Sequence, residues 1–341
     1  MNTPIVSLPA HNLFKIKAPN GVDIHIPGEY DSATDVYGHL QSGEQILEYY
    51  QTNGYVVARS LIPEEVCDHA LKAFTQEMKP YQGFVYRQAT ANPEKHVFTT
   101  HHHMLNAVMN LQDLNTNKFP NFRDASLQTL THPKLRAFLK ILMKQEAVLV
   151  QTMFFEGNPA TWPHQDKDYL DSMQPGKMVA AWIALEDIKP GAGRFYIYPK
   201  SHKIDIEKIG KNLNIILDRE AYKSLVVDTI NEYQLECRAP ALRKGDVLFW
   251  DGKTIHGSLP TTQPEYSRAS FTGHYIPTSK SLLQLQVREK KLKIRKVEGI
   301  GVNFPKDQNL LINKVIFVLE TRFPTVFKNA KRKAIKLFSK K

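Results

Sequence analysis

The feature that most constrains this chain is the tripeptide His164-Gln165-Asp166, which is followed far downstream by His256. Two histidines and one carboxylate can hold ferrous iron on one side and leave the opposite side open for oxygen and a chelating co-substrate. Alternate side chains of a β-strand point the same way, so His164 and Asp166 are expected to project together. The runs 178–183 and 246–250 also have strand character, and the second delivers His256 after a short turn.

Taken alone, the tripeptide is weak evidence for a metal site. The chain has 13 histidines in 341 residues, so one His-x-Asp arises easily by chance. An isolated histidine on a strand is more often a packed or surface residue than a ligand. The metal hypothesis therefore depends on the sequence around these residues.

Eight sequence blocks surround the tripeptide, in order, between about residues 45 and 278. They cover residues 54–65, 151–155, 162–166, 181–187, 193–203, 244–250, 256–258 and 266–270. In content and order they resemble the phytanoyl-CoA dioxygenase family of iron(II)- and 2-oxoglutarate-dependent oxygenases. The resemblance implies a double-stranded β-helix, a mainly β jelly roll of two antiparallel sheets with flanking α-helices.

The resemblance also implies the metal ligands and the reaction. His164, Asp166 and His256 match the iron(II) triad. The Asp occupies the position that related halogenases leave empty for chloride, so Asp166 favours hydroxylation over halogenation. The co-substrates would be 2-oxoglutarate and O2, and the products would include succinate and CO2. The bound iron would supply the difficult chemistry, while the protein positions the substrate.

Five further residues match co-substrate contacts of the family. Arg268 matches the arginine that binds the distal carboxylate of 2-oxoglutarate, and a planar fork of donors suits that role. Ser270, two residues on and on the same strand face, is expected to share it. Three other positions fall where family members also touch the co-substrate: Ser258, Trp182 and Met153.

Three basic residues are candidates for binding an anionic group of the substrate, namely Arg87, Arg194 and Lys200. Lys200 is also a departure from the family, which usually has a small residue after the proline of its Pro-Gly-Ser-His segment. That segment borders the mouth of the active site. The lysine therefore indicates either an anionic substrate or a different turn.

The chain divides into three parts: an N-terminal extension (1–44) packing on the barrel, the oxygenase jelly roll (45–279) and a C-terminal extension (280–341). Residues 60–80 and 125–145 are expected to be helices outside the barrel. No stretch is long and apolar enough to span a membrane, and the N-terminus lacks a secretory leader. Cys67 and Cys237 form no metal-type pair, which fits a reducing compartment such as cytoplasm.

The positive charge of the chain is concentrated in the C-terminal extension. Residues 280–341 contain 17 Lys or Arg against four acidic residues, a balance of 17 − 4 = +13. The whole chain carries +11, so residues 1–279 sum to 11 − 13 = −2. The oxygenase body is therefore close to neutral.

The C-terminal extension combines this charge with helical apolar periodicity. One stripe is Leu311, Ile312, Val315, Ile316 and Leu319, and after Pro324 a second runs through Phe327, Ala330, Ala334, Leu337 and Phe338. Two basic amphipathic helices are typical of a segment lying on an anionic membrane surface, here residues 308–341. Two alternatives stay open: packing of the apolar face on the barrel, and binding of an acidic carrier protein or a phosphorylated substrate. Nucleic acid is disfavoured because no recognition motif accompanies the charge.

Three functions follow from these features. The first is a hydroxylase of a lipid-linked or membrane-associated substrate, cytoplasmic and peripheral at the inner face of a membrane. The second has the same chemistry on a soluble substrate, such as an acyl-CoA, a carrier-bound acyl group, an amino acid or a secondary metabolite. The third is a jelly-roll binding module without turnover, which a complete triad with Arg268 disfavours.

Overall fold

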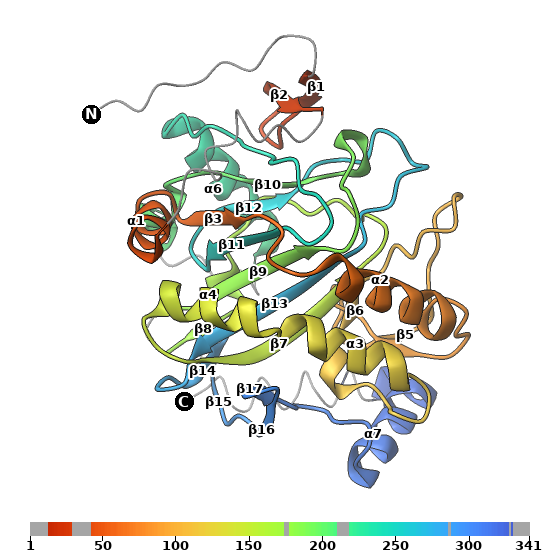
Figure 1. Ribbon diagram of the computed structural model, residues 1–341. Helices are drawn as coiled ribbons and strands as arrows, with labels where there is room; N and C mark the ends of the chain where they lie inside the picture. The colour runs from red at the N-terminus through yellow and green to blue at the C-terminus, as the bar shows by residue number, and fades with distance from the viewer. Residues whose placement is uncertain are drawn as a thin grey trace.

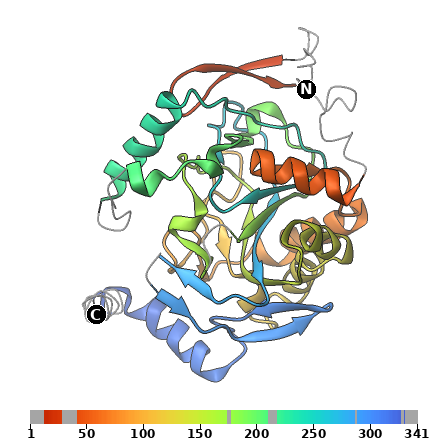
Figure 2. The same ribbon diagram turned by 90° about the vertical axis from the view of Figure 1, so that its left-hand side faces the viewer.

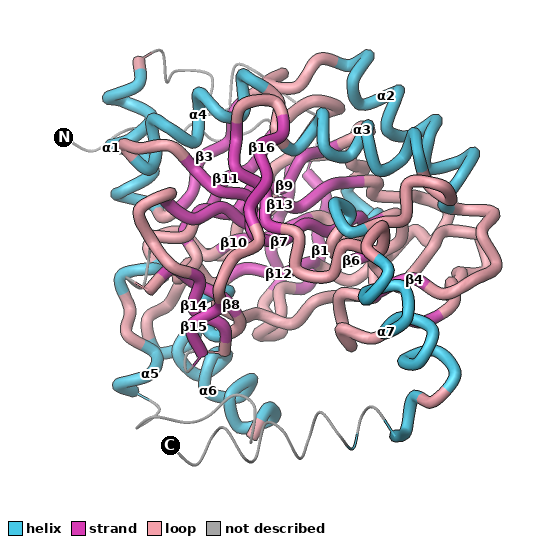
Figure 3. The backbone as a smooth tube through the Cα atoms, turned by 90° about the horizontal axis from the view of Figure 1, so that it is seen from below, coloured by secondary structure: helices cyan, strands magenta, loops and turns pink. Residues whose placement is uncertain are grey.

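A computed structural model describes residues 13–28, 42–173, 177–209, 218–285, 288–326 and 329 of the chain. The fold is mainly β and resembles a jelly roll, as the sequence predicts (Figure 1). Helices α1–α4 lie on one side of the large sheet, whereas α6 and α7 lie on the other side (Figures 2 and 3).

The large sheet has the strand order β16-β17-β7-β13-β9-β11-β3, with β6 also paired to β7. Its strands are β3 (Tyr55–Ala58), β6 (Val108–Met109), β7 (Ala147–Phe155), β9 (Val179–Ala184), β11 (Val247–Asp251), β13 (Ser270–Pro277), β16 (Ile294–Val297) and β17 (Ile300–Asn303). All pairs are antiparallel except β17 with β7. The strands expected at 178–183 and 246–250 are thus confirmed to within one residue.

The register of the large sheet aligns side chains in rows, because directly paired residues share a face. Thr272 pairs with Met153 on one side and Trp182 on the other. In the next row, His274 pairs with Ala180, which pairs in turn with Trp250. These rows form the inner face of the sheet.

Residues of opposite parity form the outer face, which packs under the helices. Phe249 stacks on Phe138 of α4 with ring centroids 4.5 Å apart, and Phe154 contacts Phe122 of α3 at 5.4 Å. Burying large aromatic side chains in this layer is a dominant favourable contribution to folding.

Smaller strand pairs lie opposite the inner face. One sheet contains β10 (Phe195–Ile197) and β12 (His256–Ser258), and another has the order β15-β14-β8, formed by β8 (Leu170–Ser172), β14 (Leu282–Gln284) and β15 (Arg288–Lys290). A short pair outside the barrel joins β4 (Val85–Tyr86) to β5 (Pro93–Glu94).

The helices are α1 (Gly43–Asn53), α2 (Glu64–Ala73), α3 (Pro120–Leu130), α4 (Pro133–Met143), α5 (Ile206–Ile209), α6 (Arg219–Glu232) and α7 (Leu311–Arg322). The expected helix at 60–80 is α2 followed by a π-helical turn, Phe74–Met78. The expected helix at 125–145 is instead two helices. Pro133 starts α4 and cannot continue α3, and His132 before it is extended at φ −52° and ψ 137°.

Residues 13–28 of the N-terminal extension form a hairpin of β1 (Leu13–Lys17) and β2 (Asp23–Pro27), and residues 42–44 begin α1. Ile16 and Ile26 of the hairpin are buried against Tyr196 and Tyr198 of the barrel. The hairpin thus adds a small apolar layer over the β10–β12 pair.

Much of the C-terminal extension is built into the barrel. Strand β14 (282–284) pairs with β8, and β17 (300–303) pairs with β7, so each of these strands extends one of the two sheets. Helix α7 follows at the edge of the molecule. The predicted stripe from Phe327 to Phe338 lies outside the described residues, apart from position 329. Within the described ranges, no helix has the length and apolar character that a membrane span requires.

Candidate metal centre

His164 and His256 lie side by side because their backbones form an isolated antiparallel bridge. The N–H of each donates to the carbonyl of the other at 3.1 Å, and the two rings are 4.4 Å apart. Asp166 completes the group: its Oδ1 lies 3.5 Å from Nε2 of His164 and 3.6 Å from Nε2 of His256. One ligand atom of each residue lies within 4.8 Å of the others. The predicted triad therefore converges.

The local backbone differs from the continuous strand that the alternation indicated. Gln165 is extended, with φ −108° and ψ 132°, but Asp166 begins a 3-10 helix that ends at Asp168. One extended residue is enough to point His164 and Asp166 the same way. Gln165 points elsewhere, and its amide donates to the carbonyl of Lys253.

The hydrogen bonds of the two imidazoles fix which nitrogen faces the centre. Nδ1 of His164 lies 2.9 Å from the carbonyl of Trp162, and Nδ1 of His256 lies 2.9 Å from that of Thr254. A nitrogen facing a carbonyl must carry the hydrogen, so Nε2 of each ring presents its lone pair to the centre. The site thus offers the donor set that a divalent metal requires.

Burial and charge set the protonation of the triad. Burial lowers the pKa of His256 to about 4, so its ring is neutral at pH 7. Burial also opposes protonation of His164, but the hydrogen bond and charge of Asp166 outweigh it and raise the His164 pKa. Burial disfavours an ionised Asp166, whereas the surrounding histidines hold the pKa of this carboxyl well below its usual range. The carboxylate is therefore charged.

Two inner-face residues that the sequence did not assign to the site hold Asp166. The indole N–H of Trp250 donates to Oδ2 at 2.8 Å, and Nε2 of His274 lies 3.3 Å from the same oxygen. Their side chains meet Asp166 because their strands pair through Ala180. Their alternate positions along β11 and β13 could have indicated that they face inward. Only the register of the two strands against β9 shows that they lie next to each other.

Arg268 is a buried cation whose environment suits an anion. Its exposed fraction is 2%, its Nε has no partner, and no acidic side chain in the described part of the chain pairs with it. Burial lowers its pKa to about 10, which leaves it charged at pH 7. Oγ of the nearby Ser270 is also buried without a partner. A carboxylate between these groups would satisfy both.

The other three expected co-substrate residues lie around this centre. Met153 and Trp182 belong to one row of the inner face, through Thr272. Ser258 is on β12, two residues after His256, and its Oγ accepts from the N–H of Thr161 at 2.7 Å. Their contacts with 2-oxoglutarate stay predictions.

The three basic candidates for substrate binding occupy different settings. Arg87 is fully buried and donates to the carbonyl of Asn106 at 2.8 Å. Arg194 is buried, and its guanidinium donates to the carbonyls of Ile188, Pro27 and Gly28. Both guanidinium groups thus bind the chain's own backbone. Lys200 is exposed and adopts the left-handed conformation at φ 68°, in which a glycine would be less strained.

An aromatic and basic cluster borders the centre next to His164. The rings of Trp162 and Tyr169 lie 5.6 Å and 5.8 Å from the ring of His164. From α6, the guanidinium of Arg219 and the ammonium of Lys223 lie 5.9 Å and 5.5 Å from the Trp162 ring. Helix α6 was not predicted to be part of the site, because its apolar pattern carries no sign that it packs beside the metal ligands.

Comparison with known proteins agrees with this geometry. Residues 50–269 match the sequence model of the phytanoyl-CoA dioxygenase (PhyH) family. The chain is 27% identical over 159 residues to phytanoyl-CoA dioxygenase domain-containing protein 1 of Mus musculus, covering 45% of this chain and 53% of that protein. It is 21% identical over 296 residues to the peroxisomal phytanoyl-CoA dioxygenase of Homo sapiens, covering 81% and 80%. The chain thus spans about half the length of the mouse relative.

A solved structure shares the fold. It is the epimerase SnoN in complex with Fe3+, alpha ketoglutarate and nogalamycin RO, with a TM-score of 0.52 and 17% identity. The match covers 72% of this chain and 87% of SnoN. At this identity the likeness concerns the fold.

Proposed function

The chain belongs to the phytanoyl-CoA dioxygenase family of iron(II)- and 2-oxoglutarate-dependent oxygenases, and on that premise we propose that it hydroxylates an unactivated C–H bond of a lipid-linked or membrane-associated substrate. The observation that carries the oxygenase chemistry is the convergence of His164, Asp166 and His256, with both imidazole Nε2 atoms turned inward. Iron and 2-oxoglutarate, when bound, would supply the oxidation, with consumption of O2 and release of succinate and CO2.

The residues of the centre fit ferrous iron. Two imidazole nitrogens and one carboxylate oxygen on one side form the ligand set of non-haem iron oxygenases. Oδ2 of Asp166 is held by Trp250, so Oδ1 is the oxygen available as a ligand. Because the carboxylate cannot rotate without losing this hydrogen bond, the donor set is preorganised.

Arg268 would bind the distal carboxylate of 2-oxoglutarate, and Ser270 would donate its hydroxyl to the same group. In the absence of an anion, the guanidinium is buried without an acidic partner, which is costly. Binding of the co-substrate removes that cost. Met153, Trp182 and Ser258 would enclose the rest of the co-substrate and exclude water.

The substrate would bind beside His164, next to an aromatic surface. A small-molecule substrate fits the family, and the aromatic rings of Trp162 and Tyr169 beside His164 offer an apolar wall. A lipid chain would pack on such rings. The basic C-terminal extension supports a membrane-associated substrate by charge, with the protein peripheral on a cytoplasmic membrane face.

A soluble anionic substrate is the second candidate, and Arg219 and Lys223 over the Trp162 ring favour it. These cations would bind the phosphate of an acyl-CoA or of a carrier-bound acyl group. Arg87 and Arg194 are less suited to that role because their guanidinium groups bind backbone carbonyls.

The test is succinate formation from 2-oxoglutarate in the presence of iron(II), measured with fractionated lipid extracts and, separately, with acyl-CoA and metabolite mixtures. We expect a lipid fraction to stimulate turnover and to yield a product heavier by one oxygen atom. The His164→Ala and Asp166→Ala variants should release no succinate. Stimulation by the soluble mixtures alone would transfer the assignment to the second candidate. Full activity in either variant would remove the iron mechanism.

A further inference from the structure

Helix α7 exposes its apolar side chains to solvent. Leu311 and Ile312 are 78% and 64% exposed, and Val315, Val318 and Leu319 are also exposed. We call these five residues the α7 face. One alternative from the sequence was that the apolar side of this helix packs on the barrel. For α7 that prediction is wrong. Contiguous apolar surface of this kind on a folded domain marks an interaction site.

The opposite side of α7 faces the barrel through Asn313, Phe317 and Glu320. Glu320 is buried, accepts a hydrogen bond from the hydroxyl of Tyr86 at 2.5 Å and pairs with Lys306 at 3.4 Å. Asn313 donates to the carbonyl of Asp307 at 2.9 Å, and Phe317 packs on the Tyr86 ring at 5.4 Å. Turning the apolar residues inward would break these contacts and leave Glu320 facing outward without its partners.

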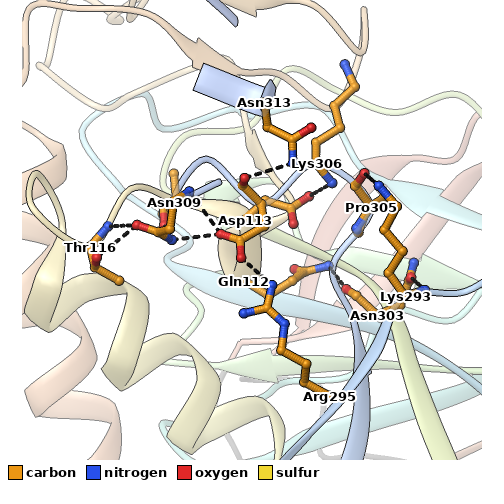
Figure 4. Close-up of polar contacts among 12 residues, drawn as sticks. Gln112, Asp113, Thr116, Lys293, Arg295, Asn303, Pro305, Lys306, Asn309 and Asn313 are labelled. Atoms are coloured by element: carbon orange, nitrogen blue, oxygen red, sulfur yellow. Dashed lines mark hydrogen bonds and ion pairs between the residues drawn. The ribbon is translucent and has the colours of Figure 1, made fainter. Parts of the chain in front are cut away.

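A polar junction fixes the segment that leads into α7 (Figure 4). We use this term for the hydrogen bonds and ion pairs that connect residues 293–313 with one another and with residues 112–116. The N–H of Lys306 donates to Oδ2 of Asp113 at 2.9 Å, and Arg295 forms an ion pair with Asp307. The amide of Asn309 accepts from the Thr116 hydroxyl at 2.8 Å. Because these anchors precede the first turn of the helix, the α7 face is held outward.

The charge around the α7 face identifies its occupant. Lys314 and Arg322 are exposed on the helix, whereas its one acid, Glu320, is buried and paired. The sequence beyond, from 328 to 341, adds seven basic residues and no acid. A second copy of the chain would bring these like charges together. An anionic bilayer offers both an apolar interior and complementary charge.

We infer that α7 is a membrane-docking helix, whose apolar face inserts into the interface of an anionic lipid bilayer. Figures 2 and 3 place it on the same side of the large sheet as α6, which contacts Trp162 beside the metal centre through Tyr222. Docking there would bring that side toward the lipid. The inference rests on the proposed membrane-associated substrate and names the surface that meets the membrane.

The test is co-sedimentation of the full chain with vesicles of phosphatidylcholine alone, or with about a third of phosphatidylserine, as the anionic lipid. The probing variant is Val315→Asn with Val318→Asn. Its matched control is Val22→Asn with Val97→Asn, two valines of similar exposure elsewhere, at 55% and 51%. We expect the wild type and the control to bind the anionic vesicles equally. The α7 variant should bind at least about tenfold more weakly.

Three outcomes would overturn the inference: a wild type that stays in the supernatant, an α7 variant that binds like the control, or a wild-type dimer that the α7 variant converts to monomer without vesicle binding. Uncoupled succinate release, measured on the same preparations, separates this result from the proposed function. A wild type that releases succinate but does not dock refutes only the docking surface. Docking without any release refutes only the oxygenase.

Discussion

Trp250 donates its indole N–H to Oδ2 of Asp166 at 2.8 Å, which leaves Oδ1 facing the two imidazole Nε2 atoms. The tryptophan thus sets which carboxylate oxygen can bind metal. It also packs on the ring of Phe195 with centroids 4.8 Å apart, so its own orientation is fixed. The ligand geometry depends on this residue of the large sheet as well as on the triad.

Removal of that hydrogen bond should weaken metal binding. We expect Trp250→Phe to lower the affinity for iron(II) by about 10- to 100-fold, because Asp166 loses the shorter of the two contacts that orient Oδ2 and keeps only the one to His274. The phenyl ring keeps most of the packing, so the melting temperature should change little. Anaerobic iron titration combined with a thermal melt separates the two effects. An unchanged iron affinity would show that Asp166 is oriented by other contacts.

Replacement of Arg268 should have opposite effects on stability and on co-substrate binding. Without 2-oxoglutarate, Arg268→Met removes a buried charge whose cationic group contacts the Phe155 ring but has no acidic partner among the described residues, and it should stabilise the fold by about 1–3 kcal/mol. Its affinity for 2-oxoglutarate should fall by about 100-fold, since a charge-assisted pair is lost. Arg268→Lys should lie between, because it keeps the charge but not the fork. Denaturant unfolding measures the stability, and titration with 2-oxoglutarate measures the affinity. A destabilised Arg268→Met would mean that the contacts of the guanidinium within the protein outweigh the cost of burying its charge.

Asp113 should make stability depend on pH. Burial raises the pKa of this carboxyl to about 7, from its ordinary value of 3.8. Between these values the folded chain keeps a proton that the unfolded chain loses, so the free energy of unfolding falls as the pH rises. Asp113→Asn keeps the acceptor for the Lys306 N–H. It should leave stability unchanged near pH 4 and increase it above pH 7 by up to about 4 kcal/mol.

Denaturant unfolding from pH 4 to pH 8 measures whether the free energy of unfolding falls as the pH rises. Asp124→Asn, at an exposed position on α3, is the matched control and should leave the profile unchanged. A variant less stable than wild type at pH 8 would mean that the charged carboxylate stabilises the polar junction.

Substitution of Lys200 by glycine tests whether this lysine contacts the substrate or only occupies a turn. Its φ of 68° is costly for any residue with a Cβ, so Lys200→Gly should stabilise the fold by about 0.5–1 kcal/mol. Lys203→Gly, at the end of the neighbouring 3-10 helix, should not stabilise it. Once a substrate is known, a drop in kcat/KM for Lys200→Gly, despite the stability gain, would show that the lysine contacts it.

Part of this structure follows from sequence patterns. The apolar runs at 178–183 and 246–250 predict two central strands, and the His-x-Asp spacing predicts that His164 and Asp166 project together. The roles of Trp250 and His274 were not predictable, because they depend on the register that aligns β11, β9 and β13. Periodicity finds α7 but cannot orient it. Glu320 and Asn313 turn its polar side inward through partners far away in the sequence.

The most direct test of the iron and 2-oxoglutarate assignment is anaerobic titration of the metal-free protein with iron(II) and then with 2-oxoglutarate, observed by visible absorption. A weak charge-transfer band should appear only after both are added, and it should be lost in Asp166→Ala. Iron binding without this band would mean that 2-oxoglutarate does not chelate the metal. The barrel would then be a binding module and not an oxygenase.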